Sequence, residues 1–333
     1  MANEIYSKSW WGSGVCFNTV GWGLVYKPYA QCGAVPALLL ALETRATYYE
    51  NETCTIATLD EIEAIAYTAP PAPTGLLVDY PNASAAYSLR NLISTTTNVV
   101  RVRRSNDQAE QDFTAAEITD GTLTTWTGAN DGFITTWYDQ SGNALNLSTS
   151  NASGQPKIVS LGVVNIDNGL PFMQYQGTEQ AAFFVGLSAT STGLNNFSGS
   201  IFTTYNSSDL IGCLLNGANF SSYIGLIDSA AVGATPNFSV GTPSYYKNST
   251  LIPNADRADL YTEYSTNSDV LATILGCDFS TTTQWDSSIS PYVYWNSNRT
   301  GASKVREFIV YNSDQTLNKS GIETNINNYY SIY

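Results

Sequence analysis

The residues best suited to chemistry lie in one uninterrupted run, residues 132–143. Aromatic and β-branched residues in its first half predict a buried strand, and Asp-Gln-Ser-Gly-Asn predicts an abrupt turn. That turn would present Trp137, Tyr138, Asp139 and Gln140 at a sheet rim. A flat aromatic beside a carboxylate and an amide can bind a sugar ring. The alternative, which the residue types alone favour, is structural: the two aromatics belong to the core and the carboxylate orders the turn.

Asp139 is expected to be structural first, because an ionised carboxylate can accept several backbone N–H groups in a tight turn. If its side chain is also exposed, it could join Asn143 and backbone carbonyls as calcium ligands, since calcium takes several oxygens in irregular geometry. Calcium is therefore the one metal we consider, and we expect no other cofactor.

A second candidate site is the basic strand predicted at Val99 to Arg103. Alternation places Arg101 and Arg103 on one face, and Arg104 follows at the strand end. Three carboxylates that could pair with these guanidiniums lie directly downstream: Asp107, Glu110 and Asp112. The group is either an internal arginine–carboxylate clamp, which we favour, or a site for an anionic sugar.

The composition removes several classes of function. The chain has 333 residues, no histidine and a net charge of -14. Without histidine, Ser-His-Asp and Cys-His catalysis and most zinc sites are excluded. The negative charge argues against nucleic acid and anionic membrane partners. The five cysteines are scattered without a Cys-x-x-Cys pair, so we expect a reducing folding environment, although Cys16, Cys32 and Cys54, in one short region, could bridge in part. We see no secretory signal and no apolar run that would span a bilayer.

The chain reads as two parts joined by a stiff linker. Residues 1–68 carry Trp10, Trp11 and Trp22, which predict either a surface buried against a partner or a small self-contained lobe. A capping box at Thr58 to Glu61 predicts a short helix to about Tyr67. The Pro-rich stretch 69–75 is the predicted linker, and residues 76–333 form the second domain.

Many short strands separated by polar turns predict that this second domain is mainly β, an antiparallel sandwich. Asp167-Asn168-Gly169 predicts a hairpin. A helix is expected from Ser320 to about Tyr329, and a helix or turn over Ala85 to Ile93. The expected strands are Leu76 to Tyr80, Val99 to Arg103, Ala182 to Val185, Ser200 to Tyr205, Gly212 to Leu215, Tyr223 to Ile227, Leu260 to Tyr264, Val270 to Cys277, Tyr292 to Trp295 and Val305 to Tyr311.

Four segments together resemble one known family: residues 87–90, 101–107, 137–143 and 155–159. It is the concanavalin A-like (laminin G-like) jelly-roll domain, found in the catalytic module of fungal arabinofuranosidase B and in fibre and spike proteins of bacteriophage virions. The ending, residues 308–311 and 322–330, is similar to the close of such domains in phages of the Bacteroidetes. The resemblance implies a jelly-roll sandwich with a small N-terminal attachment lobe.

The resemblance favours a structural protein of the phage virion surface, a fibre, spike or head-decoration subunit. It would join other virion proteins through residues 1–68 and present a lectin-like domain to host cell-surface glycans, most simply as a homotrimer. A glycoside hydrolase acting on surface polysaccharide is the alternative, and it needs two carboxylates at a fixed separation. Asp139, Glu179 and Glu307 could supply them, but no counterpart of the nucleophile segment of the fungal module is found. A purely architectural capsid protein is a third possibility.

Overall fold

The computed structural model describes residues 74–175, 193–196, 198–207, 242–253, 255–280 and 304–333, and the backbone of the strands outside these ranges. The chain divides into two units, Met1–Ala72 and Pro73–Tyr333. In the first unit the described elements are two short antiparallel pairs, β1 (Thr19–Val20) with β2 (Gly23–Leu24) and β3 (Tyr48–Tyr49) with β4 (Ile56–Ala57). The predicted helix 58–67, the residues 69–73 of the predicted linker and the predicted strand 182–185 lie outside the described residues.

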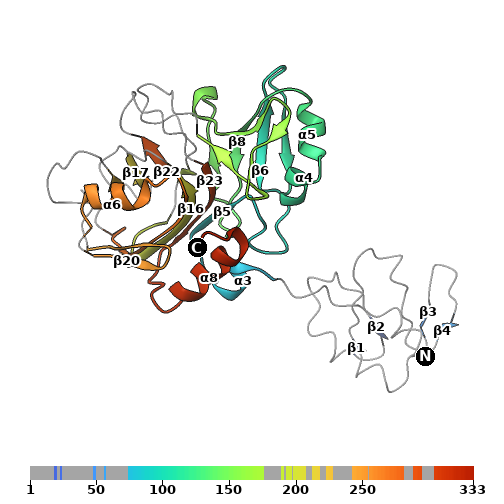
Figure 1. Ribbon diagram of the computed structural model, residues 1–333. Coiled ribbons are helices and arrows are strands. Elements are labelled where there is room, and N and C mark those ends of the chain that lie inside the picture. Colours follow the sequence, from blue (N-terminus) through green and yellow to red (C-terminus); the bar gives the residue numbers. More distant parts are fainter. Residues whose placement is uncertain are drawn as a thin grey trace. The chain divides into compact units, whose positions relative to one another are not determined.

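The second unit is mainly β and antiparallel, in agreement with the predicted jelly-roll sandwich (Figure 1). Its larger sheet has 13 described strands, in the order β20-β19-β21-β16-β23-β14-β10-β8-β6-β7, with β5, β9 and β11 paired at the side of this path. These strands are β5 (Ala85–Ser88), β6 (Val100–Arg104), β7 (Glu110–Phe113), β8 (Gly132–Trp137), β9 (Leu147–Ser148), β10 (Lys157–Ser160), β11 (Val163–Val164), β14 (Met173–Gln174), β16 (Gly199–Asn206), β19 (Ser244–Lys247), β20 (Thr250–Ile252), β21 (Asp269–Cys277) and β23 (Lys304–Tyr311).

The remaining strands form a smaller sheet and one hairpin. The smaller sheet runs in the order β15 (Ala189–Thr190), β22 (Ser288–Tyr294), β17 (Gly212–Gly217) and β18 (Tyr223–Ile227). The hairpin pairs β12 (Ile166–Asp167) with β13 (Leu170–Pro171). Asn168 and Gly169 form its turn with φ of 51° and 77°, the left-handed backbone that Asn-Gly tolerates best. The hairpin predicted at this position is confirmed.

The helices are short and cover defined faces of the larger sheet. Figure 1 shows α4 and α5 beside β6, and α8 near α3. The bounds are α3 (Leu76–Asp79), α4 (Ala115–Thr119), α5 (Thr122–Thr127), the 3-10 turn η3 (Ala152–Gly154), α6 (Arg257–Tyr264) and α8 (Lys319–Tyr330). The predicted C-terminal helix is confirmed as α8. No helix within the described residues is both long and apolar enough to cross a membrane.

The central strands of the larger sheet are buried on both faces. On one face of β16, Ile201 and Tyr205 join a core that reaches the smaller sheet and α6. On the other face, Phe202 packs in a second core with α3 and α8, including Ile322 and Ile326. This is why β16 reads as a nearly continuous run of apolar and hydroxyl-bearing residues rather than as an alternating one. The result is three layers: smaller sheet, larger sheet, and the pair α3 and α8.

Three predicted elements have the wrong type. Leu76 to Tyr80 forms helix α3 instead of a strand, with Leu76 and Leu77 buried in the second core. Ala85 to Ile93 begins with strand β5, because β23 pairs its residues 307–310 with this segment. Leu260 to Tyr264 lies in helix α6, which begins at a capping box formed by Asp256 and Asp259.

Candidate functional site: a polar cavity beside β23

The residues predicted to bind sugar do not form an exposed platform. Trp137 ends β8 with 0% of its surface exposed, and its ring lies 5.5 Å from that of Tyr87 inside the first core. No face of the indole is therefore open to a sugar. The expectation that Trp137 stands at a sheet rim is wrong, and the structural interpretation of this residue holds.

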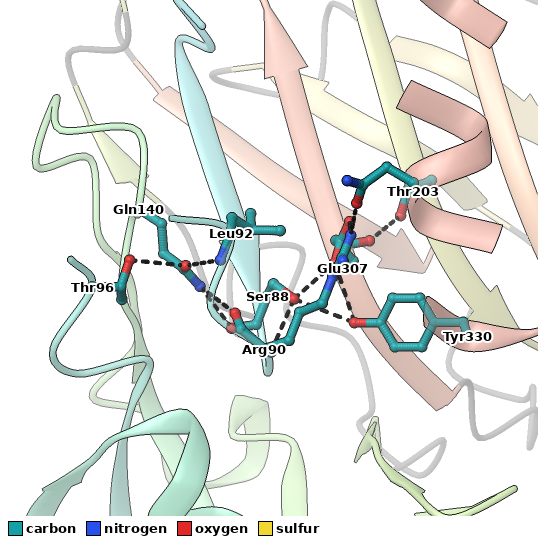
Figure 2. A network of polar contacts seen from close by, with 9 residues as sticks. Ser88, Arg90, Leu92, Thr96, Gln140, Thr203, Glu307 and Tyr330 are labelled. Atoms are coloured by element: carbon teal, nitrogen blue, oxygen red, sulfur yellow. Dashed lines mark hydrogen bonds and ion pairs between the residues drawn. The ribbon is translucent and has the colours of Figure 1, made fainter. Parts of the chain in front are cut away.

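Gln140 is also internal, and both ends of its amide are satisfied. Its Oε1 accepts from the Leu92 backbone N at 2.7 Å and from Thr96 Oγ1 at 3.2 Å. Its Nε2 donates to the carbonyls of Ser88 and Arg90 at 3.1 and 2.9 Å. Figure 2 shows the hydrogen bonds between this amide and the chain segment that follows β5. Gln140 is thus a structural cross-link, and its assignment to a sugar site is a second correction.

Asp139 is the acceptor that holds the turn after β8. Its Oδ1 accepts from the backbone N of Ala86 and of Ser141, both at 2.9 Å. Its Oδ2 accepts from Ser141 Oγ at 2.7 Å and from the Leu145 N at 3.0 Å. Asn143 directs its amide nitrogen to the carbonyls of residues 83 and 84. A calcium ion would have to displace these donors, so the geometry fits the turn role and does not fit a metal site. Within the described residues no group of three or more acidic, Cys or His side chains is arranged to hold a metal.

Tyr138 belongs to the arginine cluster on β6 and β7. Its hydroxyl donates to Asp112 Oδ1 at 2.7 Å, and Arg101 binds the same carboxylate through two nitrogens at 2.6 and 3.0 Å. Burial and this bond to Asp112 raise the pKa of Tyr138. The hydrogen bond from Arg101 lowers the pKa of Asp112. The Tyr138 hydroxyl therefore already donates its hydrogen bond within the protein.

The other two arginines of the predicted clamp behave differently from each other. Arg104 binds both oxygens of Asp107, at 2.8 and 2.6 Å, and lowers the pKa of that carboxyl to about 2. Arg103 bonds two amides, Gln155 and Gln108, and forms no ion pair within the described part of the chain. A carboxylate clamp therefore describes Arg101 and Arg104 but not Arg103.

Glu307 occupies the centre of a buried polar network between β23, β5 and α8 (Figure 2). Its carboxylate is 0% exposed and accepts from Arg90 Nε at 2.8 Å, Ser88 Oγ at 2.9 Å and Tyr330 Oη at 3.2 Å. Burial would lower the pKa of Arg90, but the charge and hydrogen bonds of Glu307 outweigh it, so the guanidinium stays charged. A carboxylate so enclosed cannot reach a substrate, and Glu307 is structural.

One described cavity combines side chains, most of them polar, from five separate parts of the chain. It has a volume of about 460 Å³ and is open to solvent. Its rim consists of the β12–β13 turn, the turn between α6 and β21, and the residue that ends α8. Asn168, Asn267 and Ser331 in these three places all have left-handed backbone, with φ of 51° to 53°. The lining residues are Asp167, Asn168, Asn206, Asn267, Ser268, Asp269, Lys304, Ser331 and Ile332.

A β-bulge positions the charges behind this cavity. Thr204 lies opposite Glu307, whereas the next residue, Tyr205, lies opposite Val305, so Arg306 is the extra residue on β23. Its guanidinium is only 1% exposed and pairs with Asp269 at 2.6 Å and more distantly with Asp167 at 3.7 Å. Within the described part of the chain, none of its N–H groups meets an acceptor in hydrogen-bond geometry, so its contribution there is mainly charge.

The two cavity carboxylates are held by cations from the same strand. Lys304 Nζ lies 2.5 Å from Asp167 Oδ2. This hydrogen bond is the main reason that the pKa of Asp167 is lowered, and Arg306 adds to it. Asp269 also accepts from Asn206 Nδ2 at 3.2 Å. Because each carboxylate has two oxygens with several acceptor positions, both can still accept hydrogen bonds from a ligand hydroxyl.

This cavity is not predicted from the sequence. Asp167-Asn168-Gly169 predicts a hairpin, but nothing in the sequence marks the turn as a rim that carries a carboxylate and an amide. Lys304, Asp269 and Asn206 are brought together only by strand pairing across the sheet, which spacing along the chain does not reveal. Trp10, Trp11, Trp22 and Glu179 lie outside the described residues.

Comparisons with known proteins give a small set of similar structures. No family model matches the chain, and no curated protein matches it. Among solved structures, a GH54 α-L-arabinofuranosidase soaked with a cyclic sulfate inhibitor is similar at 15% identity and a TM-score of 0.43. A mutant of a GH54 α-L-arabinofuranosidase, soaked with 4-nitrophenyl α-L-arabinofuranoside, is similar at 14% identity and a TM-score of 0.44. Each match covers 73% of this chain, which spans 62% of the length of those enzymes.

Proposed function

We propose that the unit Pro73–Tyr333 is a carbohydrate-binding domain and that the polar cavity beside β23 is its sugar site. The observation that carries the proposal is the lining: amide, carboxylate, hydroxyl and ammonium groups converge on one open space of about 460 Å³. A space of this size is within the usual range for small-molecule sites. Sugar hydroxyls both donate and accept hydrogen bonds, and this lining supplies partners of both kinds.

The proposal is tested by calorimetric titration of the full chain with glycans selected on an array. Asn168→Gly removes one lining amide while keeping a residue that tolerates the left-handed turn. Ser268→Tyr places a bulky ring at the exposed rim. Both changes should weaken binding about tenfold or more, because a lost or blocked hydrogen bond in a sugar site costs on the order of 1–2 kcal/mol. Asn82→Gly is the matched control, since Asn82 is an exposed left-handed asparagine that does not line the cavity. Equal binding by all four proteins would overturn this site.

Glycoside hydrolysis at the same cavity is a second candidate. Asp167 and Asp269 both line the space and share the guanidinium of Arg306. A hydrolase needs one carboxylate as base or nucleophile and one carboxyl kept protonated as acid. The lowered pKa of Asp167 suits the first role. Release of 4-nitrophenol from aryl glycosides by the wild type but not by Asp167→Asn would favour hydrolysis over binding alone.

The placement of this domain on a phage virion is a proposal that rests on the sequence resemblance. In it, residues 1–68 join the chain to other virion proteins, and a homotrimer presents the sugar sites together. Several weak sites presented together would bind a glycan-coated host more tightly than one. Labelling the chain in an image of the intact particle tests the placement directly.

A further inference from the structure

Arg103 differs from four other arginines of the described chain. Arg90, Arg101, Arg104 and Arg306 each lie within 4.0 Å of a carboxylate. Arg103 forms no such ion pair among the described residues, although the chain carries a net charge of -14. A half-buried cation without a counter-ion is unexpected in so acidic a protein, because any carboxylate nearby would be attracted to it.

Neutral groups hold Arg103 in one orientation. Its Nε donates to Gln155 Oε1 at 2.7 Å and its Nη1 donates to Gln108 Oε1 at 2.6 Å. Gln155 is itself buried, with 3% of its surface exposed, and donates through Nε2 to the Thr149 carbonyl. The guanidinium also lies 4.9 Å from the centre of the Phe133 ring. These contacts hold the side chain in place but use only some of the N–H donors of the guanidinium, and both acceptors are neutral, so its charge is not balanced by them.

Two other charged groups lie near Arg103, and only one of them already has an ion-pair partner. Lys157 is on β10, which pairs with the other edge of β8; it lies 5.3 Å from the same Phe133 ring and pairs with Asp131 at 2.8 Å. Glu110 lies directly opposite Arg103 across the β6–β7 pair, is exposed and forms no ion pair with it. Glu110 is therefore the group with which an incoming anion would compete.

We propose that Arg103 is the centre of a second binding site, which takes the carboxylate of an acidic sugar such as a uronic acid. The free part of the guanidinium binds the carboxylate, and the half-buried Phe133 ring and the exposed amide of Gln108 border the sugar. An aromatic edge and an amide beside the cation favour a saccharide over an acidic peptide. This site lies on β6 and β8 and shares no lining residue with the cavity beside β23.

The experiment is calorimetric titration of the full chain with an oligogalacturonate, and with the same oligosaccharide after methyl esterification. We expect the acid to bind and the neutral ester to lose this binding. Arg103→Gln should weaken binding of the acid about tenfold or more, because a charge-assisted hydrogen bond is lost. Arg103→Lys should bind the acid more tightly than Arg103→Gln but less tightly than the wild type, since lysine keeps the charge but lacks the planar set of N–H donors. Glu110→Gln should strengthen binding, and added salt should weaken it.

Arg104→Gln is the matched control, because Arg104 is the next residue on the strand but is already paired with Asp107. It should leave binding of the acid within about twofold, in keeping with the small effect of an exposed pair. Equal affinity of the wild type and Arg103→Gln, or no binding of the acid, would overturn the proposal. Equal competition by poly-glutamate would show that carboxylate density alone is recognised, which also contradicts an acidic-sugar site. Asn168→Gly and Ser268→Tyr separate the two sites, because they should change binding at the cavity only.

Discussion

At the residue scale, Asp139 shows how much of a turn one carboxylate can organise. Replacing it with asparagine would put an NH2 group against at least one of the N–H or O–H donors that now face its oxygens. We expect Asp139→Asn to lower the free energy of unfolding by about 1–3 kcal/mol, since a donor is left unsatisfied. Urea unfolding measures this change.

The control for this prediction is Asp314→Asn. Asp314 also accepts from a residue two positions on, Thr316, but it is exposed, so water replaces the lost bonds. Its effect should stay within about 0.5 kcal/mol. The loss caused by Asp139→Asn should be the same with calcium and with a chelator. A wild type stabilised by calcium beside an indifferent mutant would instead restore the metal interpretation.

Also at this scale, the sequence predicts the turn around Asp139 better than it predicts which of the neighbouring side chains are exposed. The turn and its carboxylate are predictable, because Asp-Gln-Ser-Gly-Asn allows few other conformations. The residue types favour a core position for Trp137 but do not decide it, since an alternating strand has two faces and the sequence does not say which face is solvated. The cavity was not predictable at all, because its rim residues come together only in the folded sheet.

At the scale of elements, helix α8 is expected to be held mainly by its apolar face. Ile326 is fully buried in the core that α8 forms with α3 and β16. Ile326→Ala should therefore cost about 2–5 kcal/mol, through lost burial and the cavity that remains. Asn328→Ala, at an exposed position of the same helix, should change stability by less than about 0.5 kcal/mol. Thermal unfolding of both variants, followed by circular dichroism, tests the contrast. Similar losses in the two would show that α8 is not anchored through this face.

The elements of wrong type have different causes. Leu260 to Tyr264 was expected to be one of many short strands, but Asp256 and Asp259 form a capping box that starts a helix. That signal was present in the sequence. The strand β5 could not be found in this way, because its alanine-rich sequence has low strand propensity and only pairing with β23 makes it a strand.

At the scale of the whole molecule, the absence of histidine predicts a broad plateau of stability with pH. The folded pKa values of Asp107, Asp112, Asp131 and Asp167 all lie below the ordinary 3.8. Their contribution to stability is present above the unfolded pKa and is lost as the pH falls through the folded values, between about 4 and 2.

The alkaline limit of this plateau follows from buried tyrosines. Burial raises the pKa values of Tyr87, Tyr264 and Tyr330 well above 10.0. Each is a group whose neutral form is favoured by folding, so its contribution is complete below pH 10 and is lost as the pH rises beyond it. Melting temperatures across the pH range measure both limits. A transition between about pH 6 and 7 would contradict this account.

A truncation tests the proposed roles of the two units. The fragment beginning at Pro73 contains both cores of the second unit and should unfold in one cooperative transition. We expect this fragment to keep glycan binding and to lose attachment to the virion. For the full chain, we expect light scattering to give the mass of a trimer. Aggregation of the fragment beside a stable monomeric full chain would mean that the tryptophans of residues 1–68 complete a core.

The position of β23 has a consequence for how this protein must be made. It pairs with β16 along one edge, and with β5 and β14 along the other, so it joins the two halves of the larger sheet. The hydrogen bond between Ser88 and Glu307 closes a loop of 219 residues. The strands synthesised earlier therefore cannot form one continuous sheet until residues 304–311 have been synthesised. We expect this step to be slow, on a timescale of about milliseconds to seconds or slower, as non-local β pairing imposes.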